Sequence, residues 1–395
     1  MDKQDIINLF LKKKLQLDSE GLDFFHSNPS KIDIFLENLE EEAAPSIINS
    51  SFIQKTLHQQ KVDIEIIKKP IYKEGRVSSQ EYAQYFSNRF DKISKILTKK
   101  LSLMNLMSIG KVTQKTRKFS VIGMVKDRDE GRMEATIEDP TGSLSLCFDE
   151  KTTPDYKQIV LDEVIGVVCE QIENFKVKNV IWPDIPLRKN VAKTNKDAFC
   201  LFVSDLHMDE DGFKKDSYKK FLDWVNKANY NNFYVFVLGD VSHDKKDVNN
   251  FFGSLPVSCY KIFLKGEIDP DIDAVDLNVP NPSLIKIEDL YMLLSHGSFM
   301  EKYASMWGAT PEVVMLNLLK KRHINPIFDL NAKIYEEDPF LLDIVPDIFA
   351  TGHFHSPSLF NYKGVTIIST GSFVSTPAFW LVNLKTRETI RIDFA

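Results

Sequence analysis

The sequence predicts a multidomain α+β protein, with a helical domain at the N-terminus, a small β-barrel in the middle and a larger domain of alternating strands and helices at the C-terminus. Three observations support this fold class. Apolar residues recur at helical spacing over residues 1–60, five short β-branched segments occupy 103–190, and strands that end in polar loops alternate with helical segments over 198–395. A chain of 395 residues is long enough for two or three domains of about 100–200 residues each.

The overall composition is that of an ordinary globular protein. Hydrophobic residues make up 43% and charged residues 27%, and no apolar run reaches the roughly 18–20 residues that span a bilayer. The start of the chain lacks the pattern of a signal peptide, so we expect a cytoplasmic protein with no membrane partner.

The four cysteines form no C-x-x-C pair, which argues against a structural zinc site and a disulfide framework. The net charge of −6 implies that any contact with nucleic acid depends on local basic patches or on a partner.

Residues 1–60 read as a helical N-terminal domain, and residues 61–102 read as a connector followed by an amphipathic helix. This helix is predicted over 81–102, where aromatic and aliphatic residues recur at helical spacing. Two interpretations of its basic face are open: a solvated surface, or a contact with nucleic acid or an acidic partner. The residues of that face are Arg89, Lys92, Lys95, Lys99 and Lys100.

Between 103 and 190 the pattern changes to short strands. The segments SVIGMV, EATIEDP, SLSLCF, VIGVVC and NVIWPDI are rich in β-branched residues, and Asp139-Pro140-Thr141-Gly142 is a strong turn signal between two of them. Five short strands in this length predict a small Greek-key barrel of OB type. Such barrels bind single strands through aromatic platforms, but this segment offers few of them, which favours use as a scaffold or interface.

From residue 198 onward, five apolar strands each deliver polar residues at their carboxyl ends, where α/β folds place their functional sites. Four of the eight histidines fall in these loops, beside Asp or Gly. The five loops contain Asp205-Leu206-His207, Gly239-Asp240, Gly266-Glu267-Ile268-Asp269, His296-Gly297 and Gly352-His353-Phe354-His355.

Imidazole and carboxylate together suit divalent metals such as manganese, iron or zinc. In D-x-H and H-x-H, two side chains leave an extended segment on the same face and can reach one ion or two adjacent ions. Two ions about 3.5–4 Å apart activate a water and stabilise both oxygens of an in-line phosphoryl displacement. A single histidine of this kind is as often a hydrogen-bonded core or surface residue, whereas the set of five loops predicts a metal site.

These five loops, in this order, resemble the signature of the calcineurin-like metallophosphoesterase superfamily. The resemblance implies a β-sandwich flanked by helices and two divalent metal ions, manganese first, with iron, zinc or magnesium as alternatives. It implies that Asp205, His207 and His355 bind the first ion and that Asp240 bridges the two. His296 and His353 would bind the second ion.

The third loop departs from the superfamily pattern, which has Gly-Asn-His followed by Asp or Glu. Glu267 stands in place of the ligating Asn and would still offer an oxygen, so it completes the predicted metal ligands. Ile268 stands in place of the histidine that contacts the scissile phosphate, and the loss of a positioned acid or base typically costs about 10²–10⁴-fold in rate. His243 is the candidate substitute imidazole, against the alternative of an ordinary loop histidine.

Longer segments resemble the small subunit of archaeal family D DNA polymerases over about residues 62–395. VIGMVKDRDEGRMEATIEDPTG is similar to the OB domain of that family, EYAQYFSNRFDKISKILTKKL to the stretch before it, and GVTIISTGSFVSTPAF to its phosphoesterase domain. The resemblance implies a replicative polymerase subunit with a 3′–5′ exonuclease site. It also implies a large catalytic subunit and DNA as partners, a sliding clamp as a further candidate, and a place at the prokaryotic nucleoid.

Three functional hypotheses follow. The chain is an exonuclease subunit of a polymerase, a non-catalytic scaffold that tethers the large subunit, or a free-standing metallophosphoesterase. The OB-type segment and the flanking similarity count against the third, and Ile268 separates the first two.

Overall fold

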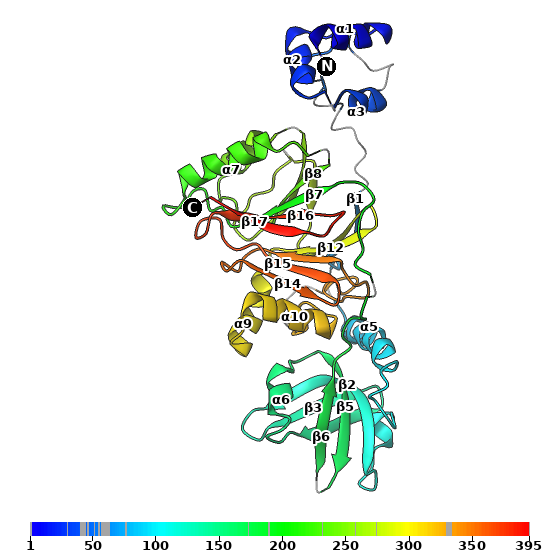
Figure 1. Ribbon diagram of the computed structural model, residues 1–395. Coiled ribbons are helices and arrows are strands. Elements are labelled where there is room, and N and C mark those ends of the chain that lie inside the picture. The colour runs from blue at the N-terminus through cyan, green and yellow to red at the C-terminus, as the bar shows by residue number, and fades with distance from the viewer. Residues whose placement is uncertain are drawn as a thin grey trace.

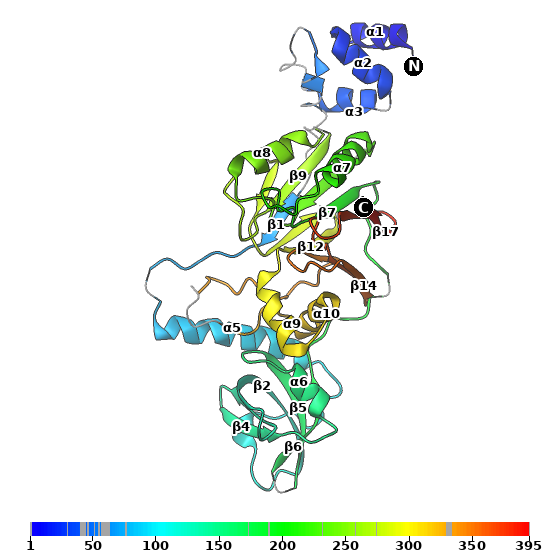
Figure 2. The ribbon, with the colours of Figure 1, turned by 90° about the vertical axis from the view of Figure 1, so that its left-hand side faces the viewer.

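The computed structural model describes residues 2–29, 31–39, 45, 47–50, 52–53, 56, 64–75, 77–172, 174–188, 190–230, 232–256, 258–273, 275–328 and 334–394. The chain folds into a mixed α and β structure, as the sequence predicts. Figures 1 and 2 show helices at the N-terminal end, two stacked sheets in the middle and a barrel at the opposite end. In the described part of the chain, no helix is both long and apolar enough to cross a membrane.

The N-terminal part consists of α1 (Lys3–Lys12), α2 (Ser19–Ser27) and α3 (Lys31–Asn38). Two of these helices begin at an aspartate whose side chain accepts a backbone N–H of the first turn. Asp2 accepts the N–H of Asp5 at 2.8 Å, and Asp18 accepts that of Gly21 at 2.7 Å. The apolar faces meet around the rings of Phe10, Phe25 and Phe35. Residues 40–44, 46, 51, 54–55 and 57–63 of the predicted helical region and connector lie outside the described residues.

Each of the five predicted strand segments of the middle region contributes to a strand, although only Asn179–Ile181 of the fifth segment, NVIWPDI, does so. The strands close into a barrel in the order β2-β3-β4-β6-β5. The barrel closes because β5 pairs with β2 along its length. At the predicted turn, the Asp139 carboxylate accepts the backbone N–H of Thr141 at 2.7 Å. The elements are η2 (Ile109–Lys111), β2 (Lys118–Asp129), β3 (Glu134–Asp139), β4 (Gly142–Cys147), α6 (Thr153–Gln158), β5 (Val164–Gln171) and β6 (Phe175–Ile181).

The predicted amphipathic helix is α5 (Ser79–Leu97), which begins at a capping box of Ser78 and Glu81. The interpretation of Arg89 as part of an exposed basic face is wrong, because only 2% of this residue is exposed. Its guanidinium donates to the Asp338 carboxylate at 2.8 Å and to backbone carbonyls from two other parts of the chain. These hydrogen bonds offset the free-energy cost of removing the guanidinium from water. Arg89 therefore holds α5 against other parts of the chain and is not part of a solvated face.

The C-terminal part contains two six-stranded sheets that share one core. One sheet has the order β1-β11-β12-β13-β15-β14 and the other β10-β9-β8-β7-β16-β17. The first comprises β1 (Ile64–Lys68), β11 (Ser283–Ile287), β12 (Leu290–Ser295), β13 (Ile348–Thr351), β15 (Val365–Ser369) and β14 (Ser358–Tyr362). The second comprises β10 (Leu277–Val279), β9 (Cys259–Leu264), β8 (Phe233–Val237), β7 (Phe199–Val203), β16 (Ala378–Asn383) and β17 (Thr389–Asp393).

One strand of these sheets comes from the segment that the sequence assigns to a connector. Residues 64–68 form β1, which pairs antiparallel with β11 at the edge of the first sheet. The N-terminal third of the chain therefore contributes backbone hydrogen bonds to the C-terminal part (Figure 2).

Helices cover the outer face of each sheet. The side chains of α7 (Lys215–Lys227) and α8 (Lys245–Ser254) pack on the β10-to-β17 sheet around Phe221, Phe251 and Phe252. On the other sheet lie η3 (Ser298–Met300), α9 (Glu301–Trp307) and α10 (Pro311–Lys321), as Figure 1 shows.

Candidate metal centre

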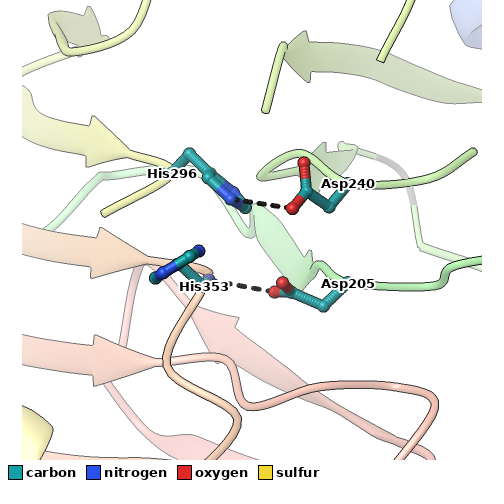
Figure 3. Close-up of side chains that lie close together, drawn as sticks. All are labelled: Asp205, Asp240, His296 and His353. Carbon is teal, nitrogen blue, oxygen red and sulfur yellow. Dashed lines mark hydrogen bonds and ion pairs between the residues drawn. The ribbon is translucent and has the colours of Figure 1, made fainter. Parts of the chain in front are cut away.

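The predicted metal ligands lie at the carboxyl ends of strands from both sheets. Strands β7, β8 and β9 run parallel in one sheet, and β12 and β13 run parallel in the other. Parallel strands end at the same edge, so the five loops that follow these strands converge there. Figure 3 shows Asp205 and Asp240 on one side of the site and His296 and His353 on the other.

The ligand atoms of these residues form two groups. One atom each from Asp205, Asp240, His296 and His353 lie within 4.8 Å of one another, and so do atoms from Asp205, His207 and His355. The structure thus places six of the seven predicted ligands in two adjacent groups. Asp205 belongs to both groups, whereas the resemblance assigns the bridging position to Asp240.

Four of these residues have a backbone conformation that non-glycine residues rarely adopt. The φ angles are 53° at Asp205, 43° at His207, 56° at Asp240 and 61° at His353. Strained backbone of this kind persists only where the surrounding structure enforces it, and it clusters at functional sites. Each of the four residues lies within four residues of the end of its strand, so the strained backbone is confined to the loops of the site.

The buried carboxylate of Asp269 holds the second and third loops together. It accepts the backbone N–H groups of Asp240 and Val241 at 2.7 Å and of Gly266 at 2.8 Å. In turn, one oxygen of Asp240 accepts the backbone N–H of Glu267 at 2.7 Å. A carboxylate that accepts several N–H groups fixes the loop that carries it, so Asp240 is oriented before any ligand binds.

A hydrogen bond also orients His296. It donates from Nδ1 to the backbone carbonyl of Leu238 at 2.8 Å, which directs Nε2 to within 3.1 Å of an Asp240 carboxylate oxygen. An outer partner of this kind fixes the ring nitrogen that a histidine presents to a metal. The ring of His207 lies between two carboxylates, with Nδ1 2.8 Å from Glu210 and Nε2 3.8 Å from Asp205, but neither contact has the geometry of a hydrogen bond.

Several buried polar atoms at this site have no hydrogen-bond partner of acceptable geometry. They are Oδ1 of Asp205, both ring nitrogens of His207, and Nε2 of His296. Unpaired buried polar atoms are rare because each costs free energy, and an unplaced ion is one of the few physical reasons for a cluster of them. The residues present therefore fit a divalent metal centre, and they would hold the ion through imidazole nitrogens and carboxylate oxygens.

The electrostatics favour a cation. Burial lowers the pKa of His296, but the carboxylates of Asp240 and Asp205 outweigh it and raise that pKa to about 9. Burial raises the pKa of Asp240, but His296 and two backbone N–H groups lower it to about 2. The Asp205 carboxylate also raises the pKa of His207. The same field that retains protons here would attract a metal ion, which competes with them.

The remaining predicted site residues lie outside the two groups. Glu267 is exposed, and only its backbone contacts Asp240. Ile268 is half-buried, and its backbone N–H reaches the same Asp240 oxygen at 3.2 Å. His243 is exposed and pairs through Nδ1 with Asp209 at 2.8 Å.

Sequence reasoning assigned no role to Asp269, Glu210 or Asp209. Each of these acidic residues lies within four residues of a predicted metal ligand. That proximity in sequence is the only signal that could have indicated them. Their partners come from loops that are distant in sequence, as for Asp269 and Asp240, so spacing alone does not reveal the contacts.

Comparisons with known protein families, solved structures and curated sequences gave different results. No model of a known protein family matches the chain. Among solved structures, an archaeal phosphodiesterase aligns with 49% of this chain and 99% of its own, with a TM-score of 0.34 and 15% identity. A zinc complex of Vps29 from Entamoeba histolytica aligns with 50% of this chain and 99% of its own, with a TM-score of 0.31 and 17% identity.

The relatives found by sequence are archaeal. The DNA polymerase II small subunit of Thermoplasma acidophilum is 23% identical to this chain in an alignment that covers 95% of this chain and 87% of that subunit. The one from Methanothermobacter thermautotrophicus is 26% identical and covers 75% of this chain and 73% of its own length. The one from Archaeoglobus fulgidus is 24% identical and covers 76% and 72%. The resemblance stated from the sequence is thereby confirmed, and the chain is a homologue of the archaeal DNA polymerase II small subunits.

Proposed function

We propose that this chain is the small subunit of an archaeal replicative DNA polymerase of family D and works with a large catalytic subunit. The observation that carries the proposal is the similarity to a polymerase small subunit over 95% of the chain. Similarity of this extent includes the helical N-terminal part, the barrel and the double-sheet part, and does not stop at a shared domain. DNA is the implied substrate, a sliding clamp is a further candidate partner, and the implied place of action is the cytoplasmic nucleoid.

We also infer the domains and their types. Residues 103–190 would be an OB-type domain, which the closed five-stranded barrel supports. Residues 198–395 would be a calcineurin-like phosphoesterase domain, which the two stacked sheets and the order of the five loops support. Residues 1–60 would form the helical N-terminal domain, and 61–102 would join it to the barrel.

The metal centre would serve 3′–5′ exonucleolytic hydrolysis. Asp205, His207, His355, Asp240, His296 and His353 would hold two divalent ions, with manganese as the first candidate and iron, zinc or magnesium as the others. Such ions supply an activated water and stabilise the charge of the phosphoryl group. Glu267 would complete the second site by a movement of its exposed side chain.

A second function has a specific observation in its favour. Ile268 cannot donate a proton, and the side chain of Glu267 lies outside both ligand groups. These departures favour a non-catalytic scaffold that tethers and stabilises the large subunit while its metal site binds ions without turnover. The scaffold and exonuclease functions share the large subunit as partner and differ only in hydrolysis.

Coexpression with the large subunit of the same organism tests the assembly. We expect the two chains to copurify as one complex, and a small subunit that elutes alone would contradict the proposal. The complex is then incubated with a 3′-labelled single strand and Mn²⁺, beside an Asp240→Ala variant. Shortening that the variant abolishes supports the exonuclease, whereas a stable complex without digestion supports the scaffold.

A further inference from the structure

Asp209 and His243 form a hydrogen-bonded pair beside the metal centre. Nδ1 of His243 lies 2.8 Å from an Asp209 carboxylate oxygen, with 61% of the histidine side chain and 28% of the aspartate side chain exposed. An ionised carboxylate only accepts hydrogen bonds, so Nδ1 carries the proton of this contact and Nε2 is the free nitrogen. The exposed position leaves Nε2 accessible to a substrate.

The Asp209–His243 pair follows directly on the backbone hydrogen bonds that join two loops carrying predicted metal ligands. The segments after β7 and β8 are joined by three hydrogen bonds, from Asp205 to Gly239 at 2.9 Å, from His207 to Asp240 at 3.2 Å and from Met208 to Val241 at 2.9 Å. Asp209 follows Met208 directly, and His243 is three residues beyond Asp240. Three residues span at most about 10 Å, so the backbone of His243 lies within about 10 Å of Asp240.

The backbone around His243 is fixed on both sides. Before it, Asp269 accepts the N–H of Val241 at 2.7 Å and of Ser242 at 3.4 Å. After it, Asp244 donates its backbone N–H to the Ser242 hydroxyl at 3.1 Å and caps α8. An ordinary surface histidine has no need of such support, whereas a group that must meet a reacting atom does.

We propose that His243 is the proton donor that replaces the imidazole missing at Ile268, and that Asp209 is its positioning residue. This proposal rests on the hydrolytic form of the function proposed above. The Asp240 carboxylate accepts the backbone N–H of Ile268 from the third loop at 3.2 Å, and His243 follows Asp240 by three residues in the second loop. The substrate class is a phosphodiester with a poor alkoxide leaving group, such as the 3′ end of a DNA strand.

The step balances without a further reactant. The oxygen of water forms a bond to phosphorus, and the bond from phosphorus to the 3′ oxygen of the penultimate nucleotide breaks. His243 acts here in its doubly protonated form, so that oxygen takes the proton from Nε2 of the imidazolium. The neutral imidazole then recovers a proton from solvent, to which the attacking water has released one. Asp209 keeps the ring oriented through Nδ1 in each state, as the carboxylate does in a catalytic triad.

The leaving group separates this role from a structural one. The polymerase complex is assayed with Mn²⁺ on a 3′-labelled DNA strand and on the p-nitrophenyl ester of thymidine 5′-monophosphate, whose nitrophenolate leaves without a proton. His243→Ala should lower DNA hydrolysis by about 10²–10⁴-fold and leave hydrolysis of the ester within about twofold of wild type. Lys246→Ala, at an exposed neighbouring position, is the matched control and should change neither rate.

Other outcomes overturn the proposal. Equal losses on both substrates would mean that His243 supports the site as a whole, and no loss on either would mean that it is a surface histidine. A wild-type complex that cleaves neither substrate would also overturn the proposal. In that case copurification with the large subunit and Mn²⁺ binding by calorimetry would still decide the proposed function on their own.

The positioning role of Asp209 has a readout that needs no metal. In the metal-free chain labelled with ¹⁵N-histidine, His243 should show a protonated Nδ1 and an unprotonated Nε2 at high pH, and Asp209→Asn should change this pattern. The same variant should lower DNA hydrolysis by about 10–100-fold and spare the nitrophenyl ester. An unchanged tautomer in Asp209→Asn would show that the carboxylate does not orient the ring.

Discussion

At the scale of single residues, Gly266 shows how tightly the metal centre is built. A Cβ atom on this residue would lie 2.2 Å from a carboxylate oxygen of Asp240 and 2.6 Å from its backbone nitrogen. Neither atom is the end of a flexible side chain, because Asp269 fixes the Asp240 backbone and two N–H groups fix its carboxylate. The close approach of the third loop therefore requires glycine at this position.

We expect Gly266→Ala to weaken Mn²⁺ binding at least about tenfold, because the added methyl group must displace a ligand whose position sets the affinity. Gly253→Ala is the matched control, since a Cβ there would meet nothing within 4 Å. Isothermal titration calorimetry measures the affinity, and circular dichroism checks that both variants fold. Equal Mn²⁺ affinities in the two variants would show that the third loop does not constrain Asp240.

The sequence could predict most of the candidate ligands but little of what positions them. Asp205 and His207, or His353 and His355, stand out because each pair has a spacing of two next to an apolar strand. The left-handed backbone at Asp205, His207 and His353 and the contacts of the Asp269 carboxylate depend on packing between loops that local periodicity does not encode. The same limit applies to His243, whose partner Asp209 is 34 residues away.

At the scale of elements, α5 is held by an arginine that its own sequence context does not explain. Periodicity places Arg89 with four lysines on a charged face, yet its partners are Asp162, Pro326 and Asp338, which are 73 to 249 residues away. Residues 64–68 were assigned to a connector for the same reason: their partner strand, β11, lies more than 200 residues further along the chain, so local periodicity does not reveal the pairing. The helices and barrel strands were predictable because their signals are local.

Arg89→Met should destabilise the protein by about 3–5 kcal/mol, since it leaves the Asp338 carboxylate buried beside carbonyls that have lost their donor. Lys95→Met, at an exposed position of the same helix, should change stability by less than about 0.5 kcal/mol. Unfolding in urea followed by circular dichroism measures both. A loss of similar size in the two variants would mean that helix propensity or added hydrophobic surface, and not the buried contact, accounts for the effect.

At the scale of the whole molecule, a buried arginine and a buried ion pair join the barrel to the sheets. Arg89 of α5 links a barrel carbonyl at Asp162 to Asp338 of the double-sheet part. Lys321 at the end of α10 lies 2.7 Å from Glu163 of the barrel, with 2% of each side chain exposed. Buried charges of this kind hold one geometry because any displacement leaves a charge unpaired. The barrel and the sheets are therefore expected to unfold together.

The junction should also make stability depend on pH. Only 3% of the side chain of His323 is exposed, and its Nε2 donates to Asp338 at 2.8 Å while Nδ1 accepts the N–H of Asn325 at 3.2 Å, which defines a neutral imidazole. Burial, aided by the charge of Arg89, lowers the pKa of His323 to about 4. Burial raises the pKa of Asp338, but His323 and Arg89 outweigh it and hold that pKa well below its usual range.

Because the pKa of His323 is lower in the folded chain than the ordinary value near 6.5, the unfolded chain binds more protons between about pH 4 and 6.5, and stability must fall as the pH falls through this window. The expected loss is on the order of 3 kcal/mol, and the depressed pKa of Asp338 adds a further loss below about pH 4.

His323→Gln keeps a donor for Asp338 and cannot titrate, so its stability should fall less steeply than that of the wild type between pH 6.5 and 4.5. Urea unfolding of the metal-free chain at several pH values measures both slopes. His296 does not contribute to the slope in this pH window, because its raised pKa lowers the stability of the folded chain only as the pH rises from about 6.5 toward 9. Parallel slopes in the two proteins would place the acid sensitivity outside this junction.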